Sequence, residues 1–251
     1  MLRQAASIQA DKLAGETMDR NISIGTILSE LVAVLSASLR DFAIFAGGLG
    51  LLTAIGVIAG VTETESASLS FGYSVDASQG AASALFELVL LVANIVGGYW
   101  LLKQLLAARG LLHTQGNRFW PYLGMSILTG LGAIVGLILV IVPGIIVLIR
   151  WSAASGYVIG AGESVTDSMS TSWRATSGHS WAIFFAAIVV FLGLIVAAGT
   201  VVTVFGALNA TLGAVVSAFI ESAASGIFAG FVVAIYSLVS HDTQQLSETF
   251  G

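Results

Sequence analysis

Apolar segments alternate with short polar segments along most of the chain. A helix needs about 20 apolar residues to cross a hydrocarbon core roughly 30 Å thick, and segments of that length recur through the sequence. The pattern therefore predicts an all-α membrane bundle of six transmembrane helices. Their expected bounds are 42–61, 83–106, 120–142, 144–161, 181–204 and 214–239.

The third and fourth of these predicted helices come from one long apolar run. Within residues 120–161 the only charge is Arg150, and the pair Pro143 and Gly144 lies near the middle. A single helix over this run would be roughly 60 Å long, about twice the thickness of a bilayer core. Because Pro-Gly favours a turn, the run is expected to form two spans joined at this pair.

Two further segments have helical amphipathic patterns but are too polar to cross a membrane. Residues 23–39 start with Ser23 as an N-cap, and residues 164–177 start with a capping box of Ser164 and Asp167. Both are predicted to lie in the membrane interface, after a polar N-terminal tail over residues 1–22. The second helix is expected to end at Gly178 and to form a weakly apolar stripe from Val165, Met169, Trp173 and Thr176.

Composition agrees with one polytopic membrane domain over residues 1–251. Hydrophobic residues make up 57% of the chain and charged residues 9%, and the mean hydropathy is +0.96. Soluble domains carry about 25% charged residues, so this is an integral membrane protein. The expected partners are membrane lipids together with a second copy of the chain or other membrane proteins, and no nucleic acid is expected. The absence of cysteine excludes disulfides and thiolate sites.

The basic residues predict the orientation. Short cytoplasmic loops carry an excess of Lys and Arg, whereas the loop over residues 62–82 contains acidic residues and no basic ones. That loop is therefore expected outside the cytoplasmic membrane, and both termini are expected in the cytoplasm. The basic residues that then share the cytoplasmic side are Arg3, Lys12, Arg20, Arg40, Lys103, Arg109, Arg118 and Arg174.

The three outward-going spans start in a similar way. Each places a basic or imidazole side chain shortly before aromatic residues, as in the segments that begin at Arg40, Arg118 and His179. Two interpretations stay open. Snorkelling cations and aromatic belts belong at this depth in any membrane protein, and a three-fold repeat of helical hairpins gives the same pattern.

The segments PGIIVLIRW and SWRATSGHSW, with Glu163 between them, carry a family resemblance. They resemble uncharacterised six-span bacterial inner-membrane proteins, a family related to the membrane domain fused to some glycerophosphoryl diester phosphodiesterases. The resemblance implies fold and topology more than activity. The phosphodiesterase catalytic domain itself is not expected, because no soluble segment is long enough to form it. The matching residues are Pro143, Gly144, Arg150, Trp151, Glu163, Ser172, Trp173, Arg174, Gly178, His179 and Trp181.

Arg150 is the main candidate for chemistry within a predicted span. An arginine at the centre of a span costs about 2.5 to 3.5 kcal/mol on insertion scales and needs a partner or water. Depths counted along the helices allow a pair with Glu87 or with Glu221. One interpretation is an ion or proton path or a polar pocket for a head group. The other is a clamp between helices.

No constellation of residues indicates catalysis. The histidines His113, His179 and His241 lack metal-ligand spacing, and no nucleophile has a base beside it in a recognisable pattern. We therefore expect no catalytic residues, no cofactor and no metal. The favoured function is a non-enzymatic membrane protein that supports envelope or lipid organisation or membrane-protein assembly. The alternatives are a small transporter or channel that uses Arg150, and an accessory to a lipid-handling enzyme.

Overall fold

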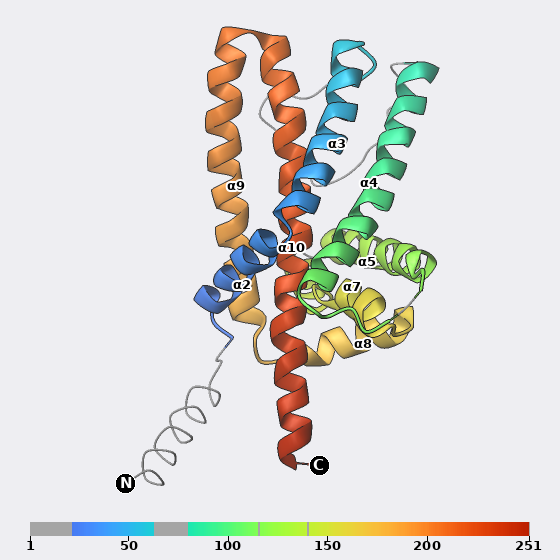
Figure 1. The fold of residues 1–251 in the computed structure, drawn as a ribbon, viewed down its shortest axis with the longest axis vertical. Coiled ribbons are helices and arrows are strands. Elements are labelled where there is room, and N and C mark those ends of the chain that lie inside the picture. The colour runs from blue at the N-terminus through green and yellow to red at the C-terminus, as the bar shows by residue number, and fades with distance from the viewer. Residues whose placement is uncertain (1–21, 63–79, 115, 140, 251) are drawn as a thin grey trace.

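The computed structural model describes residues 22–62, 80–114, 116–139 and 141–250, without the side chains of 136–141 and 241–250. This part of the chain is helical and contains no strand, as the all-α prediction requires (Figure 1). Residues 1–21 of the predicted tail and most of the loop over 62–82 lie outside the described residues. The helices are α2 (Ile24–Ala37), α3 (Leu39–Ile58), α4 (Ala81–Ala108), α5 (Phe119–Leu139), α6 (Ile141–Arg150), α7 (Ala154–Gly156), the π-helix η2 (Tyr157–Ala161), α8 (Val165–Ala175), α9 (Ser180–Leu208) and α10 (Ala210–Phe250).

Helix α10 is the central element of the bundle. It packs along α3 and α9 and also contacts α2 and α4, as Figure 1 shows. In its apolar stretch, Ala210–Ser240, 67% of the residues of the most apolar window are buried, against 17% for α4 and 17% for α9. The core is therefore built on α10, and the surrounding helices keep most of their apolar surface outside.

Five helical segments in the described chain are long and apolar enough to cross a membrane, which makes this a multi-pass membrane protein. They are Leu39–Ile58, Ala81–Ala108, Val142–Ala161, Ser180–Leu208 and Ala210–Ser240. The predicted third span corresponds to α5, whose apolar part with described side chains, Phe119–Val135, is shorter. In Figure 1, α5 lies crosswise to α3, α4, α9 and α10 instead of alongside them.

The predicted fourth span is not one continuous α-helix. Helix α6 begins at Ile141, so the break falls just before Pro143, and Pro143 lies in the first turn, where its missing N–H is tolerated. After Arg150 the chain turns through residues 151–153 and then continues as α7 and η2. Gly162, with φ +77°, ends η2 in the left-handed conformation.

The two predicted amphipathic helices are present as α2 and α8. Ser23 caps α2 by accepting from the backbone N–H of Thr26, and Ser164 caps α8 by accepting from that of Asp167. Gly178, with φ +93°, follows the end of α8.

The apolar stripe predicted for α8 is split by the fold. Met169 and Thr176 are buried against the protein, as are the hydroxyl-bearing Ser168 and Ser172, whereas Trp173 is 41% exposed. The side of α8 that faces the bundle is therefore partly polar. Burial of these hydroxyls is possible because they donate hydrogen bonds to backbone carbonyls. Sequence periodicity ranks such positions as polar and assigns them to the wrong side.

The helical pairs differ in length from one another. The pair α5 and α6 has helices of 21 and 10 residues, whereas α9 and α10 have 29 and 41. The equal hairpins that a three-fold repeat predicts are therefore not evident. The polar segment after residue 239 was expected as a tail, but α10 continues through it to Phe250.

Candidate functional site at the basic end of the bundle

Four arginines gather where α4 ends and α5, α6 and α8 meet. Arg109 caps α4, Arg118 precedes α5, Arg150 ends α6 and Arg174 lies in the last turn of α8. Contacts of α8 with α5, α6 and α10 bring these segments together. We call this region the basic end of the bundle. It lies at the level of α2, α5, α7 and α8 in Figure 1.

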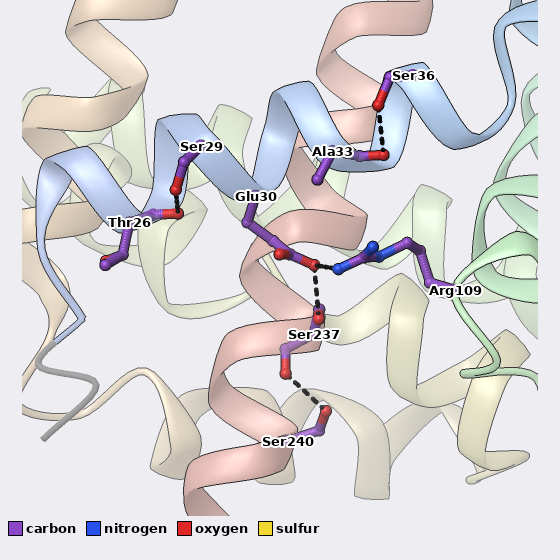
Figure 2. Close-up of polar contacts among 8 residues, drawn as sticks. All are labelled: Thr26, Ser29, Glu30, Ala33, Ser36, Arg109, Ser237 and Ser240. Atoms are coloured by element: carbon purple, nitrogen blue, oxygen red, sulfur yellow. Dashed lines mark hydrogen bonds and ion pairs between the residues drawn. The ribbon is translucent and has the colours of Figure 1, made fainter. Parts of the chain in front are cut away.

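The first polar cluster joins three helices. Nη2 of Arg109 lies 2.5 Å from a carboxylate oxygen of Glu30 on α2. The same oxygen accepts a hydrogen bond of 2.9 Å from the hydroxyl of Ser237 on α10. Figure 2 shows Glu30 between the two donors. Because the Glu30 side chain is only 13% exposed, the cluster fixes α2 and α4 against α10.

The second cluster is organised by Arg118, which reaches the end of η2. Its Nε donates to the carbonyl of Val158 at 3.3 Å, and its Nη2 donates to the carbonyl of Glu163 at 2.5 Å and to that of Gly162. The backbone N–H of Arg118 donates to the hydroxyl of Tyr99 on α4 at 2.8 Å. Carbonyls at a helix end lack intrahelical partners, and here one guanidinium donates hydrogen bonds to several of them.

The loop before α5 also caps η2. The hydroxyl of Thr114 donates to the carbonyl of Ile159 at 2.6 Å, and the backbone N–H of His113 donates to that of Gly160 at 2.9 Å. Residues 153–160 are all buried, so these otherwise orphaned carbonyls need such partners. The loop and Arg118 together hold a non-α backbone segment inside the protein, where irregular structure is tolerated.

Tyr236 of α10 packs against the same segment. Its ring meets that of Tyr157 edge to face, with centroids 4.9 Å apart. A Cβ atom placed on Gly156 would lie 2.3 Å from Cγ of Tyr236, and one on Gly160 would lie 3.1 Å from its hydroxyl. Gly156 is therefore needed for this close approach to α10, whereas a Cβ on Gly160 would first meet the carbonyl oxygen of Leu111, at 2.8 Å.

Arg150 does not meet either acid that the sequence offered as its partner. Its Nη1 donates to the carbonyl of Trp173 at 3.3 Å, and its guanidinium carbon lies 5.5 Å from the centroid of the Trp173 ring. Glu221 instead accepts a 2.8 Å hydrogen bond from Ser217, one turn earlier on α10. The predicted pair is therefore not formed. The prediction treated the fourth span as one straight helix, whereas α6 ends at Arg150 beside α8.

Glu87 and the remaining motif residues occupy separate places. Glu87 lies in the second turn of α4 and is partly buried. Arg174 is exposed on α8, His179 precedes α9, and Trp181 is 74% exposed in its first turn. The carboxylate oxygen Oε2 of Glu163 and Nδ1 of His179 are buried without a partner among the described residues. The motif thus includes residues of the basic end but does not form one catalytic cluster.

The residues that sequence reasoning missed are Glu30, Arg109, Thr114 and Arg118 as contact-forming groups. Glu30 lies within the amphipathic segment predicted over residues 23–39, and Arg109 and Arg118 contribute to the sequence prediction only as residues that set the orientation. The one available signal was the position of Arg118 just before an apolar helix, which does not reveal contacts with residues forty or more positions away.

The arrangement holds helices together through charge-assisted hydrogen bonds. Among the residues that the structure describes, no group of three or more His, Asp or Glu side chains is arranged to hold a metal ion. Comparison of the chain with protein-family models, curated proteins and solved structures gives no match. The resemblance to the phosphodiesterase-associated membrane family therefore stays a prediction.

Proposed function

We propose that this chain is a non-enzymatic protein of the bacterial inner membrane that organises envelope lipids or supports the assembly of other membrane proteins. The observation that carries the proposal is the contrast between the interior and the outer helices. Glu30 and Arg109 bond to each other and Arg118 bonds to backbone carbonyls, while α4 and α9 each leave most of their apolar residues unburied. Such surfaces suit contacts with lipid tails or with other helices.

The proposed orientation places the basic end in the cytoplasm. Arg109, Arg118, Arg150 and Arg174 all lie there, and the positive-inside rule assigns such an end to the cytoplasmic side. Trp120 and Trp181, each about three quarters exposed, lie at the starts of α5 and α9, as an interfacial aromatic belt requires. Helix α2 lies at this end and α10 runs down to it, which supports cytoplasmic termini (Figure 1).

The interfacial position of α2 and α8 belongs to the same proposal, whereas the six predicted spans are replaced by four full spans and one hairpin. Ten residues of α6 measure about 15 Å, half of a bilayer core. Because α6 ends at the basic end, its length favours a hairpin of α5 and α6 that enters the membrane there and returns without crossing. The four remaining spans, α3, α4, α9 and α10, leave both termini on one side.

The alternatives have less support. The transport hypothesis required Arg150 to face Glu87 or Glu221 within the membrane, but Arg150 contacts Trp173 of α8 instead. The role as an accessory to a lipid-handling enzyme rests on the family resemblance alone. Both stay predictions from the sequence.

A photocrosslinking experiment tests the proposed use of the outer surface. A photoreactive amino acid replaces Val196 of α9, which is 68% exposed, and in a control it replaces Val190, which is 9% exposed. In native membranes we expect crosslinks to one defined membrane protein, to a second copy or to a defined lipid class from position 196 and few from position 190. A pattern at position 196 that only mirrors the bulk membrane composition would contradict the proposal.

A further inference from the structure

Arg150 is held in place by the helix next to it. The hydroxyls of Ser172 and Thr176 both donate to the backbone carbonyl of Arg150, at 2.7 and 3.3 Å. Both side chains are fully buried, so α8 fixes the end of α6 through two hydrogen bonds. The backbone from which the guanidinium extends is thus anchored before any ligand binds.

The guanidinium is also oriented by tryptophan. It lies over the ring of Trp173, whose edge meets the ring of Trp151, with centroids 6.4 Å apart. Trp151 in turn packs on Gly132 of α5, where an added Cβ would lie 2.5 Å from its ring. The stack connects Arg150 to α5 and α8 and favours one direction for the cation.

Most of the hydrogen-bonding capacity of Arg150 is unused by the protein. A guanidinium has five N–H donors, and among the described residues only Nη1 has an acceptor, at the weak distance of 3.3 Å. Within the described ranges, no ion pair joins Arg150 to a carboxylate. The guanidinium of Arg150, held by the two tryptophans, therefore presents N–H donors at the basic end that have no acceptor in the described part of the protein.

We propose that Arg150, with Trp173 and Trp151, binds the phosphodiester group of an anionic glycerophospholipid. Arginine matches phosphate oxygens in bidentate fashion, and tryptophan rings prefer head-group depth. A half-exposed cation at the level of an interfacial helix is within reach of lipid phosphates from the cytoplasmic leaflet. This inference rests on the proposed membrane orientation but not on the assembly or lipid-organising role.

The same N–H donors suit a soluble phosphate, so the experiment compares both sources. The detergent-solubilised full chain is titrated with phosphatidylglycerol, phosphatidylcholine or inorganic phosphate, and bound molecules are measured by native mass spectrometry. We expect phosphatidylglycerol to bind best, because choline brings its own cation to the site. Inorganic phosphate that binds alone and displaces the lipid would overturn the assignment to a lipid.

Variants test the residue assignment. Arg150→Ala should weaken binding of phosphatidylglycerol about tenfold or more, since a charge-assisted hydrogen bond is worth about 1.5 kcal/mol at least. Arg174→Ala is the matched control, because it removes an exposed cation from α8, next to Trp173 in sequence, and leaves Arg150, Trp151 and Trp173 in place. Equal losses in both variants would indicate diffuse attraction and contradict a site at Arg150.

Two further measurements keep the outcome decisive. Arg150→Lys retains the charge but not the planar fork, and we expect intermediate affinity if the variant unfolds at the temperature of the native chain. Trp173→Leu keeps an apolar side chain and should weaken binding without removing the cation. Unchanged affinity in both variants would overturn the proposed geometry. The photocrosslinking result at Val196 is independent of these values, so failure here does not decide the proposed function.

Discussion

Glu30 and Arg109 are 79 positions apart, yet their charged groups are 2.5 Å apart at the junction of α2, α4 and α10. The side chains are 13% and 31% exposed, so solvent screens their attraction only in part. Helix α2 has few other means of attachment to α4, and the pair fixes its direction across the bundle (Figure 2).

We expect Arg109→Ala to destabilise the folded state by about 2 kcal/mol, because it leaves the partly buried Glu30 carboxylate with Ser237 alone. The measurement is reversible unfolding in a mixed detergent, followed by tryptophan fluorescence. In a double-mutant cycle with Glu30→Gln, the two changes should couple by about 1 kcal/mol. Additive losses of unfolding free energy in the two single variants would show that the Glu30–Arg109 pair makes no specific contribution to stability.

The packing of Tyr236 on Gly156 gives a second prediction. Gly156→Ala should destabilise the protein by about 1 to 3 kcal/mol, because its Cβ would lie 2.3 Å from Cγ of the tyrosine. Gly193→Ala on α9 is the control, since nothing lies within 4 Å of its added Cβ, and we expect no loss there. Equal thermal stability of the two variants would contradict the close contact between α7 and α10.

Helix positions were the predictable part of this fold. Apolar length and local capping residues act within one turn, and Ser23, Ser164 and Gly178 placed the ends of α2 and α8 correctly. These signals depend on neighbours in sequence and need no knowledge of the tertiary structure.

The candidate site could not be predicted in the same way. The break after Arg150 depends on Ser172 and Thr176, which bond its carbonyl from a different helix. The π-helix likewise depends on Arg118 and on the fit of Gly156 to Tyr236. A depth count along the sequence assumes straight helices, and tertiary contacts are what bend this segment.

Arg118 provides a third prediction, on local rather than global stability. Arg118→Ala leaves the carbonyls of Val158, Gly162 and Glu163 without their donor, so residues 157–163 should exchange amide hydrogens faster. Arg118→Lys should restore little of the protection against exchange, because one ammonium lacks the planar arrangement of donors that reaches all three carbonyls. Arg174→Ala, measured in parallel, should leave this exchange unchanged. Full recovery by lysine would indicate a role for charge alone.

Orientation gives a fourth prediction, for which the absence of native cysteine is convenient. His113→Cys lies at the basic end and Ala210→Cys at the turn between α9 and α10, and both positions are exposed. An impermeant maleimide should label position 210 on intact cells and position 113 only after permeabilisation. Because the imidazole is replaced without loss of the backbone hydrogen bond to Gly160, the first variant should fold normally. The reverse labelling would invert the proposed orientation.

The depth of the hairpin of α5 and α6 gives the last prediction. Val142 lies at the start of α6 and is 62% exposed, and six full spans would place it at the outer surface. The ten residues of α6 reach only about 15 Å from Arg150, so we expect the start of α6 to lie within the hydrocarbon core. Val142→Cys should then not react with an impermeant maleimide added from either side. A spin label attached at this position should be more accessible to oxygen, which dissolves in hydrocarbon, than to a polar nickel complex. Ala210→Cys is the control for outer exposure, and labelling of position 142 at its rate would establish a complete crossing by α5.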